Sequence, residues 1–474
     1  MAPTLTPDIC VIGAGSAGLS VAAGAAQLGA ETVLVEADKM GGDCLNYGCV
    51  PSKALLAAAH AAEASRRAAR FGIRAGEPVI DFRAVHDHVH GVIAAIAPHD
   101  SEERFAGLGV RIVRARARFV GPRELIAGDL RIHARRFVIA TGSRPLVPPV
   151  PGLDRVPYLT NETVFDLTER PPRLLVLGGG PIGCELAQAF RRLGSSVSII
   201  EMATLLPKDD PELVDVIRRR LLDDGIALHE RSKVVGVEPA TGGLAVSIET
   251  DGTTSRVTGS HLLVAAGRRA NFADLDLAAA GVAHTPSAIA VDARLRTTNR
   301  RIYAIGDAIG GLQFTHLAGY HAGIVIRNAL FRWPARVDQR ALPSVTYSEP
   351  ELAQVGLTEA AARAAGHDVQ VLRSPFARND RAQTEHATDG LVKAVVTRRG
   401  RILGAAIVGP HAGELIHPWV LAIANNLKIG ALATMIAPYP TLGEAGKRAA
   451  GNFYAPKLFN TRTRALVRFL RWFG

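Results

Sequence analysis

Two stretches of the chain share one pattern of apolar and polar positions. The first, DICVIGAGSAGLSVAAGAAQLGAETVLVE, predicts an apolar strand, a glycine turn, a small-residue helix and a second strand that ends at Glu36. The second, RLLVLGGGPIGCELAQAFRRLGSSVSIIE, repeats this order about 165 residues later and ends at Glu201. The nearly charge-free segment 9–30 also resembles a membrane span or a signal sequence. Because no basic segment precedes it and its glycines are regularly spaced, we predict strand, turn and helix instead.

The glycines of both stretches have the spacing of a dinucleotide-binding fingerprint. The first glycine allows the turn, the second lets the backbone approach a pyrophosphate at a helix N-terminus, and the third packs the helix on the strand. The terminal carboxylate, Glu36 or Glu201, accepts a hydrogen bond from a ribose 2′-hydroxyl. Since a carboxylate repels a 2′-phosphate, Glu201 favours NAD(H) over NADP(H), although the basic Lys208 lies nearby. The predicted glycines are Gly13, Gly15 and Gly18, then Gly178, Gly180 and Gly183.

Outside the two repeats, other apolar runs predict further strands. Residues 137–145 (FVIATGSRP), 261–271 (HLLVAAGRRAN) and 301–311 (RIYAIGDAIGG) each predict a strand that ends in a small-residue turn. The last leaves Asp307 at the strand end, where it either accepts from a cofactor hydroxyl or forms an Asp turn or helix N-cap. The proline-rich segment 146–157 predicts a linker between domains. After residue 341, strand-like runs at 391–397 and 401–408 without a glycine fingerprint predict a separate α+β unit with an interface role.

The segment GGDCLNYGCVPSK, residues 41–53, holds two thiols five positions apart. On a regular helix the Cα atoms of Cys44 and Cys49 would lie roughly 8 to 9 Å apart, too far for a disulfide. If they pair, the backbone must bend, and Gly48 permits that bend. An accessible bridge of this kind suits redox chemistry better than a structural role, and the cation of Lys53 favours the reactive thiolate. Zinc needs about four ligands, so we predict no resident metal, and the isolated Cys10 and Cys184 are expected to be buried in apolar surroundings.

Composition narrows the class of protein. The chain has 474 residues, of which 48% are hydrophobic and 21% charged, which is ordinary for a globular protein of about three domains. Four cysteines without a disulfide-rich pattern indicate a reducing cytoplasm. The net charge of +11 comes mostly from scattered arginines with no aromatic-interleaved basic motif, so nucleic acid is not the expected partner. Anionic dinucleotides would meet a favourable field.

Taken together, GGDCLNYGCVPSK, both fingerprints, ATGSRP and YAIGD, which span almost the whole chain, resemble the motifs of the pyridine nucleotide-disulfide oxidoreductases. This family includes dihydrolipoamide dehydrogenase, glutathione reductase and mercuric reductase. The resemblance implies an α/β fold with two Rossmann-like dinucleotide-binding domains and a C-terminal α+β dimerisation domain, and therefore a homodimer. It implies an FAD-binding domain at residues 1–150 completed by 271–340, an NAD(P)-binding domain at 151–270, and a dimerisation domain at 341–474.

The same resemblance assigns roles around the two thiols. Electrons pass from NADH through FAD to a Cys44–Cys49 disulfide and then to a substrate. Cys49 is expected to face the flavin and Cys44 to exchange with the substrate. Lys53 is expected beside the flavin N5, paired with Glu185, and Asp307 on the ribityl chain. The expected cofactor-binding set is completed by Gly42, Thr141, Gly142, Ser143 and Gly267.

Two departures from the family pattern affect the chemistry. Members that act on dithiols carry HPTxxE, in which the partner subunit supplies a His–Glu acid–base pair, whereas this chain has YPTLGE with Tyr439 and Glu444. A phenol with a pKa near 10 cannot shuttle protons at neutral pH as imidazole does. Tyrosine there is similar to mercuric reductases, where it lines the metal-ion site, but their C-terminal cysteine pair is missing here, and interface packing is the alternative role. Asp43 replaces a common threonine. Pointing at Cys44, its charge would raise the pKa of that thiol; the alternative is that Asp43 points at the FAD.

The substrate and the C-terminal tail stay open at this point. Dihydrolipoamide, another disulfide, a metal ion and a quinone are all compatible with the relay, and a flavoprotein docked to a membrane or partner with incidental turnover is a further hypothesis. The tail, residues 456–474, is compatible with docking on the dimer or on another partner and, as the alternative, with an interfacial membrane helix. Its arginines are Arg462, Arg464, Arg468 and Arg471, set among Leu466, Val467, Phe469, Leu470, Trp472 and Phe473.

Overall fold

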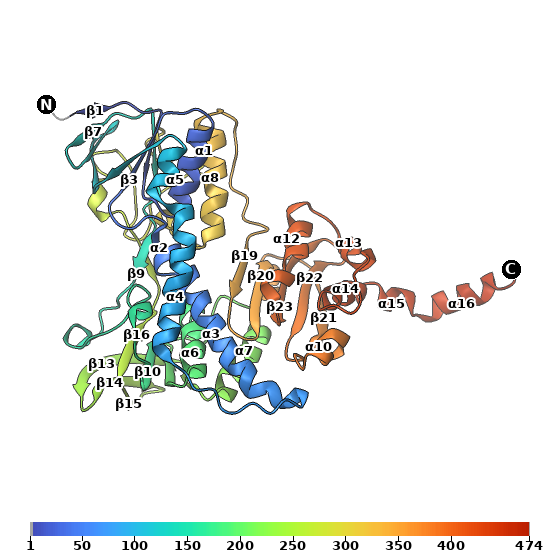
Figure 1. Cartoon of the computed structure of the whole chain (residues 1–474). Helices are drawn as coiled ribbons and strands as arrows, with labels where there is room; N and C mark the ends of the chain where they lie inside the picture. Colours follow the sequence, from blue (N-terminus) through green and yellow to red (C-terminus); the bar gives the residue numbers. More distant parts are fainter. Residues whose placement is uncertain (1–2, 474) are drawn as a thin grey trace.

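The computed structural model describes residues 3–473; Met1, Ala2 and Gly474, the last residue of the predicted tail, lie outside the described residues. The chain forms two α/β units with parallel sheets and a C-terminal unit with an antiparallel sheet, which agrees with the predicted fold class (Figure 1). From the C-terminal unit, α15 (Ala455–Leu458) and α16 (Thr461–Leu470) extend away from the rest of the molecule (Figure 1).

The first unit is built on a five-stranded parallel sheet. Side chains on one face of its central strand, such as Val11, pack with α1 (Ser16–Gln27) and α8 (Thr315–Ala329), which lie side by side (Figure 1). The opposite face, with Cys10, packs on a small four-stranded sheet, so this thiol is fully buried as predicted. The strand order is β18 (Ile302–Ala304), β8 (Arg136–Ile139), β2 (Ile9–Ile12), β3 (Thr32–Glu36) and β4 (Val110–Arg114). The small sheet has the order β1 (Thr4–Leu5), β7 (Leu130–Ile132), β6 (Glu124–Ala127) and β5 (Ala117–Gly121).

The second unit repeats this arrangement. Alternate residues of its central strand face a helix on one side, as Val176 does, and an antiparallel sheet on the other, as Leu175 does. Such strands are covered on both faces, which explains their continuous apolar sequences. The parallel strands follow the order β12 (Ala227–His229), β11 (Ser196–Ile200), β10 (Arg173–Leu177) and β16 (His261–Val264), with helices α6 (Pro181–Arg192) and α7 (Pro211–Asp223). The antiparallel strands are β13 (Ser232–Ala240), β14 (Gly243–Thr250) and β15 (Thr253–Gly259).

The C-terminal unit is an antiparallel five-stranded sheet with helices, as the patterns of 391–397 and 401–408 predict. Its core surrounds the buried Trp419. The strand order is β19 (Pro343–Thr346), β20 (Glu351–Gly356), β23 (Ile402–Gly409), β22 (Leu391–Thr397) and β21 (Val369–Pro375). Three of the helices that contribute to this core are α12 (His417–Ala424), α13 (Ile429–Thr434) and α14 (Glu444–Gly451).

The two-thiol segment is a broken helix. Cys44 lies in α2 (Gly42–Asn46), and Cys49 is the first residue of α3 (Cys49–Arg67). Gly48, between them, has φ −124° and ψ −109°, which places the predicted bend at this glycine. The start of α2 contacts the first fingerprint turn directly, since a Cβ added to Gly42 would lie 2.7 Å from the Cα of Gly15. The redox segment and the fingerprint turn are therefore held together by backbone contact.

Candidate active site

One large cavity, of about 2250 Å³, is lined by residues of all three units. Both thiols open into it, together with most of the predicted cofactor-binding residues. Four predicted residues do not line it within one chain: Gly18, Gly183, Tyr439 and Glu444. The predicted residues that do line it are Gly13, Gly15, Glu36, Gly42, Cys44, Cys49, Lys53, Thr141, Gly142, Ser143, Gly178, Gly180, Glu185, Glu201, Gly267 and Asp307.

Two glycines stay outside the cavity because they serve helix packing. A Cβ on Gly18 would lie 1.8 Å from the carbonyl oxygen of Gly13, and a Cβ on Gly183 would lie 1.9 Å from that of Gly178. Any side chain at either position would push the helix off its strand. This contact is the packing expected of the third fingerprint glycine.

Both fingerprint turns present helix N-termini and a carboxylate to the cavity. Helices α1 and α6 begin after Gly15 and Gly180, which have no side chain to cap the first N–H groups. The carboxylate of Glu36 accepts hydrogen bonds from the backbone N–H groups of Ala14 at 2.5 Å and Asp38 at 2.6 Å. Glu201 is held in the same way by two backbone N–H groups, at 2.6 and 2.8 Å. Open N–H groups and an oriented carboxylate fit the pyrophosphate and the ribose of a dinucleotide, once in each unit.

The two sulfurs differ in acidity. Cys44 and Cys49 are both free thiols in the structure. The pKa of Cys49 is lowered because Cys44 donates a hydrogen bond to it, with further support from the Thr315 hydroxyl, 3.4 Å from its sulfur, and from the charge of Lys53. These effects outweigh burial, which acts in the opposite direction. The pKa of Cys44 is raised, first because it is the donor in this hydrogen bond and then because it is buried. Cys49 is therefore the thiolate at neutral pH and Cys44 the thiol.

Lys53 is anchored by a buried carboxylate. Its Nζ lies 2.8 Å from Oε2 of Glu185, whose other oxygen accepts from the backbone N–H of Tyr347 at 2.9 Å. The same ammonium lies 4.4 Å from the centre of the Tyr347 ring. These contacts hold one positive charge on the first turns of α3, beyond Cys49.

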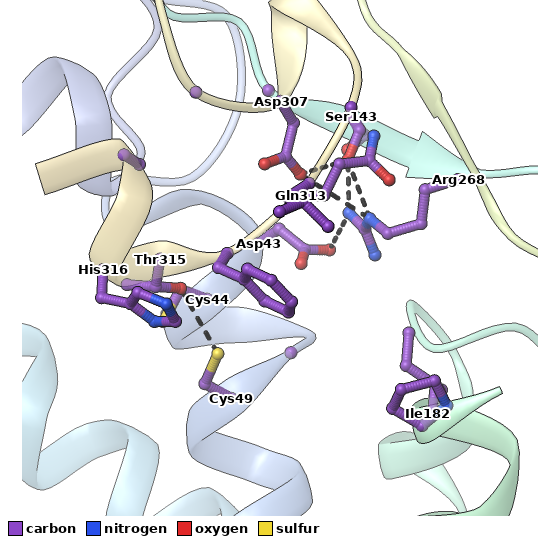
Figure 2. Close-up of a pocket in the computed structure, with 18 of the residues that line it drawn as sticks. Asp43, Cys44, Cys49, Ser143, Ile182, Arg268, Asp307, Gln313, Thr315 and His316 are labelled. Atoms are coloured by element: carbon purple, nitrogen blue, oxygen red, sulfur yellow. Dashed lines mark hydrogen bonds and ion pairs between the residues drawn. The ribbon is translucent and has the colours of Figure 1, made fainter. Parts of the chain in front are cut away.

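Asp43 points away from Cys44 and toward the guanidinium of Arg268, at 3.0 Å. It also accepts a hydrogen bond from Asn161 at 3.1 Å. Of the two orientations that the sequence left open, the structure has Asp43 turned away from Cys44. The pKa of Cys44 is raised by its hydrogen bond to Cys49 and by burial, and the repulsion from Asp43 acts on Cys49. Figure 2 shows Asp43 on one side of Arg268, across from the strand-end residues of the first unit.

Arg268 also organises the predicted strand-end residues. Its Nε donates to the hydroxyl of Ser143 at 2.8 Å, and that hydroxyl donates to Asp307 at 2.6 Å (Figure 2). Burial raises the pKa of Asp307, while Ser143 and Arg268 oppose this effect. The carboxylate of Asp307 is thus oriented toward the cavity by neighbours from two other segments of the chain.

Roles for Thr315, Arg268 and Asn161 were not predictable from the sequence patterns around them. Arg268 follows directly after Gly267 in a motif that was singled out, and this position was the one available signal for it. Thr315 is 266 residues from Cys49 in the sequence, and Asn161 is 118 residues from Asp43. No local pattern relates residues at such separations.

Tyr439 and Glu444 are not brought to the cavity by their own chain. The Tyr439 side chain is 71% exposed, and its hydroxyl donates to the carboxylate of Asp380 at 3.1 Å. Glu444 accepts instead from the backbone N–H of Thr441 at 3.2 Å. The two residues therefore form no tyrosine–glutamate pair analogous to the family's His–Glu pair.

Comparisons with known proteins agree with this architecture. Residues 7–322 match the family described as pyridine nucleotide-disulphide oxidoreductase, and residues 342–450 match its dimerisation domain. A mercuric reductase of Streptomyces lividans is 37% identical over 454 residues, covering 94% of this chain and 96% of that protein. A dihydrolipoyl dehydrogenase of Thermus scotoductus is 38% identical over 463 residues, covering 94% and 97%. The Cu(II) complex of the HOCl-induced flavoprotein disulfide reductase of Escherichia coli matches with a TM-score of 0.84 at 29% identity, covering 94% of this chain and 99% of that one.

Proposed function

Because the chain belongs to the pyridine nucleotide-disulphide oxidoreductases, we propose that its Cys44–Cys49 pair passes electrons from NADH to a thiophilic metal ion. The enzyme is an FAD-dependent pyridine nucleotide-disulfide oxidoreductase, and its dimerisation domain supports a homodimer. The reducing cytoplasm is the proposed location, since the chain has only four cysteines and no disulfide-rich pattern. The choice of metal ion as substrate depends on Tyr439.

The first unit is proposed to hold FAD and the second NADH. The flavin, when bound, supplies two-electron transfer between the nicotinamide and the sulfur pair. Glu201 is proposed to select NADH, because its carboxylate is fixed at the ribose end of the second fingerprint and would repel a 2′-phosphate. For FAD the proposed residues are Gly13, Gly15, Glu36, Gly42, Thr141, Gly142, Ser143 and Asp307; for NADH they are Gly178, Gly180, Glu201 and Gly267.

The observation that supports a metal ion as substrate is that Tyr439 replaces the family's histidine. Reduction of a disulfide requires a proton for the leaving thiolate, and the tyrosine at position 439 is a poor proton donor at neutral pH. Its pKa is raised further by the hydrogen bond to Asp380. A soft metal ion needs no proton, because it binds thiolates directly. We expect Tyr439 to reach the cavity of a second copy of the chain, where its hydroxyl is available to an ion.

The sulfur pair is proposed to act as both ligand and electron donor. Cys49 binds the ion as a thiolate, and Cys44 loses its proton as the ion coordinates its sulfur. For Hg(II), the two thiolates then give two electrons to the metal and form the Cys44–Cys49 disulfide, so that Hg(II) becomes Hg(0). NADH then gives up a hydride, and its two electrons reduce the Cys44–Cys49 disulfide back to the dithiol state.

Parallel steady-state assays test the substrate proposal. The enzyme is assayed with NADH and Hg(II), Cu(II), oxidised glutathione or a quinone, and with NAD⁺ and dihydrolipoamide. We expect fast turnover with a metal ion and slow turnover with dihydrolipoamide. Tyr439→His should raise dihydrolipoamide turnover by about 10²-fold or more, because it restores an acid–base group, whereas Tyr439→Phe should not. Fast dihydrolipoamide turnover by the unmodified enzyme would contradict the proposal and favour the activity named for its dihydrolipoyl dehydrogenase relative.

A further inference from the structure

The C-terminal helix α16 takes no part in the proposed relay. It lies beyond residue 450, where the match to the dimerisation domain ends. The preceding segment is anchored in the C-terminal core by Phe453, which is 4% exposed, with the ammonium of Lys457 3.9 Å from its ring centre. Beyond this anchor, α15 and α16 project away from the body (Figure 1), and in the described part of the chain no residue of α16 is buried.

Helix α16 is well formed but has an uncovered apolar face. The side chain of Asn460 caps its start by accepting from the N–H of Thr463 at 3.0 Å, and backbone hydrogen bonds continue the helical turn to Phe473. A helix of this length is marginal in water unless its apolar face is covered. The residues of that face, at spacings of three and four, are Leu466 (54% exposed), Phe469 (59%), Leu470 (52%) and Phe473 (74%).

The opposite face is basic. Arg464, Arg468 and Arg471 share it at spacings of four and three, and no acidic residue follows Glu444. Trp472, which is 88% exposed, follows directly at the end of the helix. An apolar face, a basic face and an exposed tryptophan are together the features of a helix that lies in the interface of a bilayer.

Two surfaces could cover the apolar face of α16, a second copy of the chain or a lipid bilayer, and their charge distinguishes them. The whole chain has a net charge of +11, so a second copy would present an overall repulsive field to this basic helix. An anionic lipid surface attracts the arginines and receives the apolar face at the same time. We propose that α16 binds the surface of membranes containing anionic lipids and brings the reductase to them.

Sedimentation with lipid vesicles tests this proposal on the full-length flavin-loaded enzyme. Vesicles of phosphatidylcholine mixed with phosphatidylglycerol should bind it, pure phosphatidylcholine vesicles should bind it much less, and added salt should weaken binding. Replacing Arg464, Arg468 and Arg471 by serine should weaken binding by about a hundredfold, at about fivefold for each arginine. Phe469→Glu should weaken it by about tenfold or more through loss of apolar burial.

Matched variants on the body of the protein serve as controls. Serine replacements of the exposed Arg83, Arg111 and Arg123 change the net charge by the same amount as the three replacements in α16. Val79→Glu matches Phe469→Glu, because it places a carboxylate at an apolar residue that is 98% exposed. These should bind vesicles within about twofold of the unmodified enzyme.

Three results would overturn the proposal. The first is equal binding, or none, to the two kinds of vesicle, and the second is an unchanged affinity of the α16 variants. The third is loss of the dimer in Phe469→Glu by analytical ultracentrifugation, which would mean that the helix covers a second copy instead. NADH oxidation with a soluble acceptor should be unchanged in all α16 variants, so the vesicle result does not depend on the identity of the substrate.

Discussion

The acidity of Cys49 depends most on its neighbour Cys44, and the substitution Cys44→Ala measures this dependence. Hydrogen bonding from Cys44, with smaller effects of Thr315 and Lys53, lowers the pKa of Cys49 from 9.0 to about 6. A hydrogen bond to a charged group contributes about 1.5 to 3 kcal/mol, which corresponds to about one to two pH units. We therefore expect the pKa of Cys49 in Cys44→Ala to rise to about 7 to 8.

The assay is the pH dependence of alkylation in the reduced enzyme after removal of the flavin, because the pKa of about 6 belongs to the chain without the cofactor that Cys49 is expected to face. Iodoacetamide reacts with the thiolate, so the rate of Cys49 modification, followed by mass spectrometry, should reach half its maximum near pH 6 in the unmodified enzyme. The midpoint should move upward in Cys44→Ala, and by a smaller amount in Thr315→Val. Thr315→Ser retains the hydroxyl and should leave the midpoint in place. The buried Cys10 and Cys184, whose pKa values burial raises, should remain unmodified in the folded enzyme.

Two results would refute this reasoning. If the midpoint of the unmodified enzyme lies near 8.5, the value of an ordinary thiol, then Cys49 is not a stabilised thiolate. If Cys44→Ala has the same low midpoint as the unmodified enzyme, the hydrogen bond between the two sulfurs is not the main cause, and the Thr315 hydroxyl and the charge of Lys53 must account for the acidity.

Three further substitutions test other contacts. Glu185→Gln removes the charge of a buried carboxylate that pairs with the partly exposed Lys53, and should reduce the free energy of unfolding by about 1–2 kcal/mol in urea titrations. The exposed Glu77→Gln should change it by less than about 0.5 kcal/mol. Glu201→Ala should lower the ratio of kcat/KM for NADH to that for NADPH by about tenfold or more; an unchanged ratio would exclude Glu201 as the selecting group. The hydrogen bond from Arg373 lowers the pKa of Glu212 to about 2, below its ordinary 4.5, so this contribution to stability is complete above pH 4.5 and is lost as the pH falls toward 2. Arg373→Ala should be less stable at pH 7 but lose less stability across that interval, as measured by urea titration at each pH.

Features encoded by neighbouring residues were predictable from the sequence. The two fingerprints, the strands that end at their carboxylates, and the bend at Gly48 each depend on residues within about 30 positions, because local backbone geometry and hydrophobic periodicity determine them. The buried positions of Cys10 and Cys184 followed from the apolar runs around them. For these elements the sequence pattern and the observed structure agree closely.

Contacts between distant segments were not predictable in the same way. The orientation of Asp43 toward Arg268 depends on the pairing of β17 (Arg268–Ala270) with β9 (Ser143–Pro145). The contact between Thr315 and Cys49 depends on where α8 begins. Similarly, Tyr439 can be aligned with the family's histidine, but its hydrogen bond to Asp380 follows from the tertiary structure of the C-terminal unit. The orientation of Asp43 was therefore not readable from its place in the sequence.

The contact between Gly42 and Gly15 limits how this enzyme can be changed. A methyl group at position 42 would meet backbone, which cannot rotate aside as a side chain can, so the nucleotide turn and the sulfur-bearing helix would have to separate. Cofactor retention and thiol reactivity should then fail together rather than one at a time. Transplanting the sulfur segment into another scaffold would accordingly require the nucleotide turn as well, because their backbones are in direct contact.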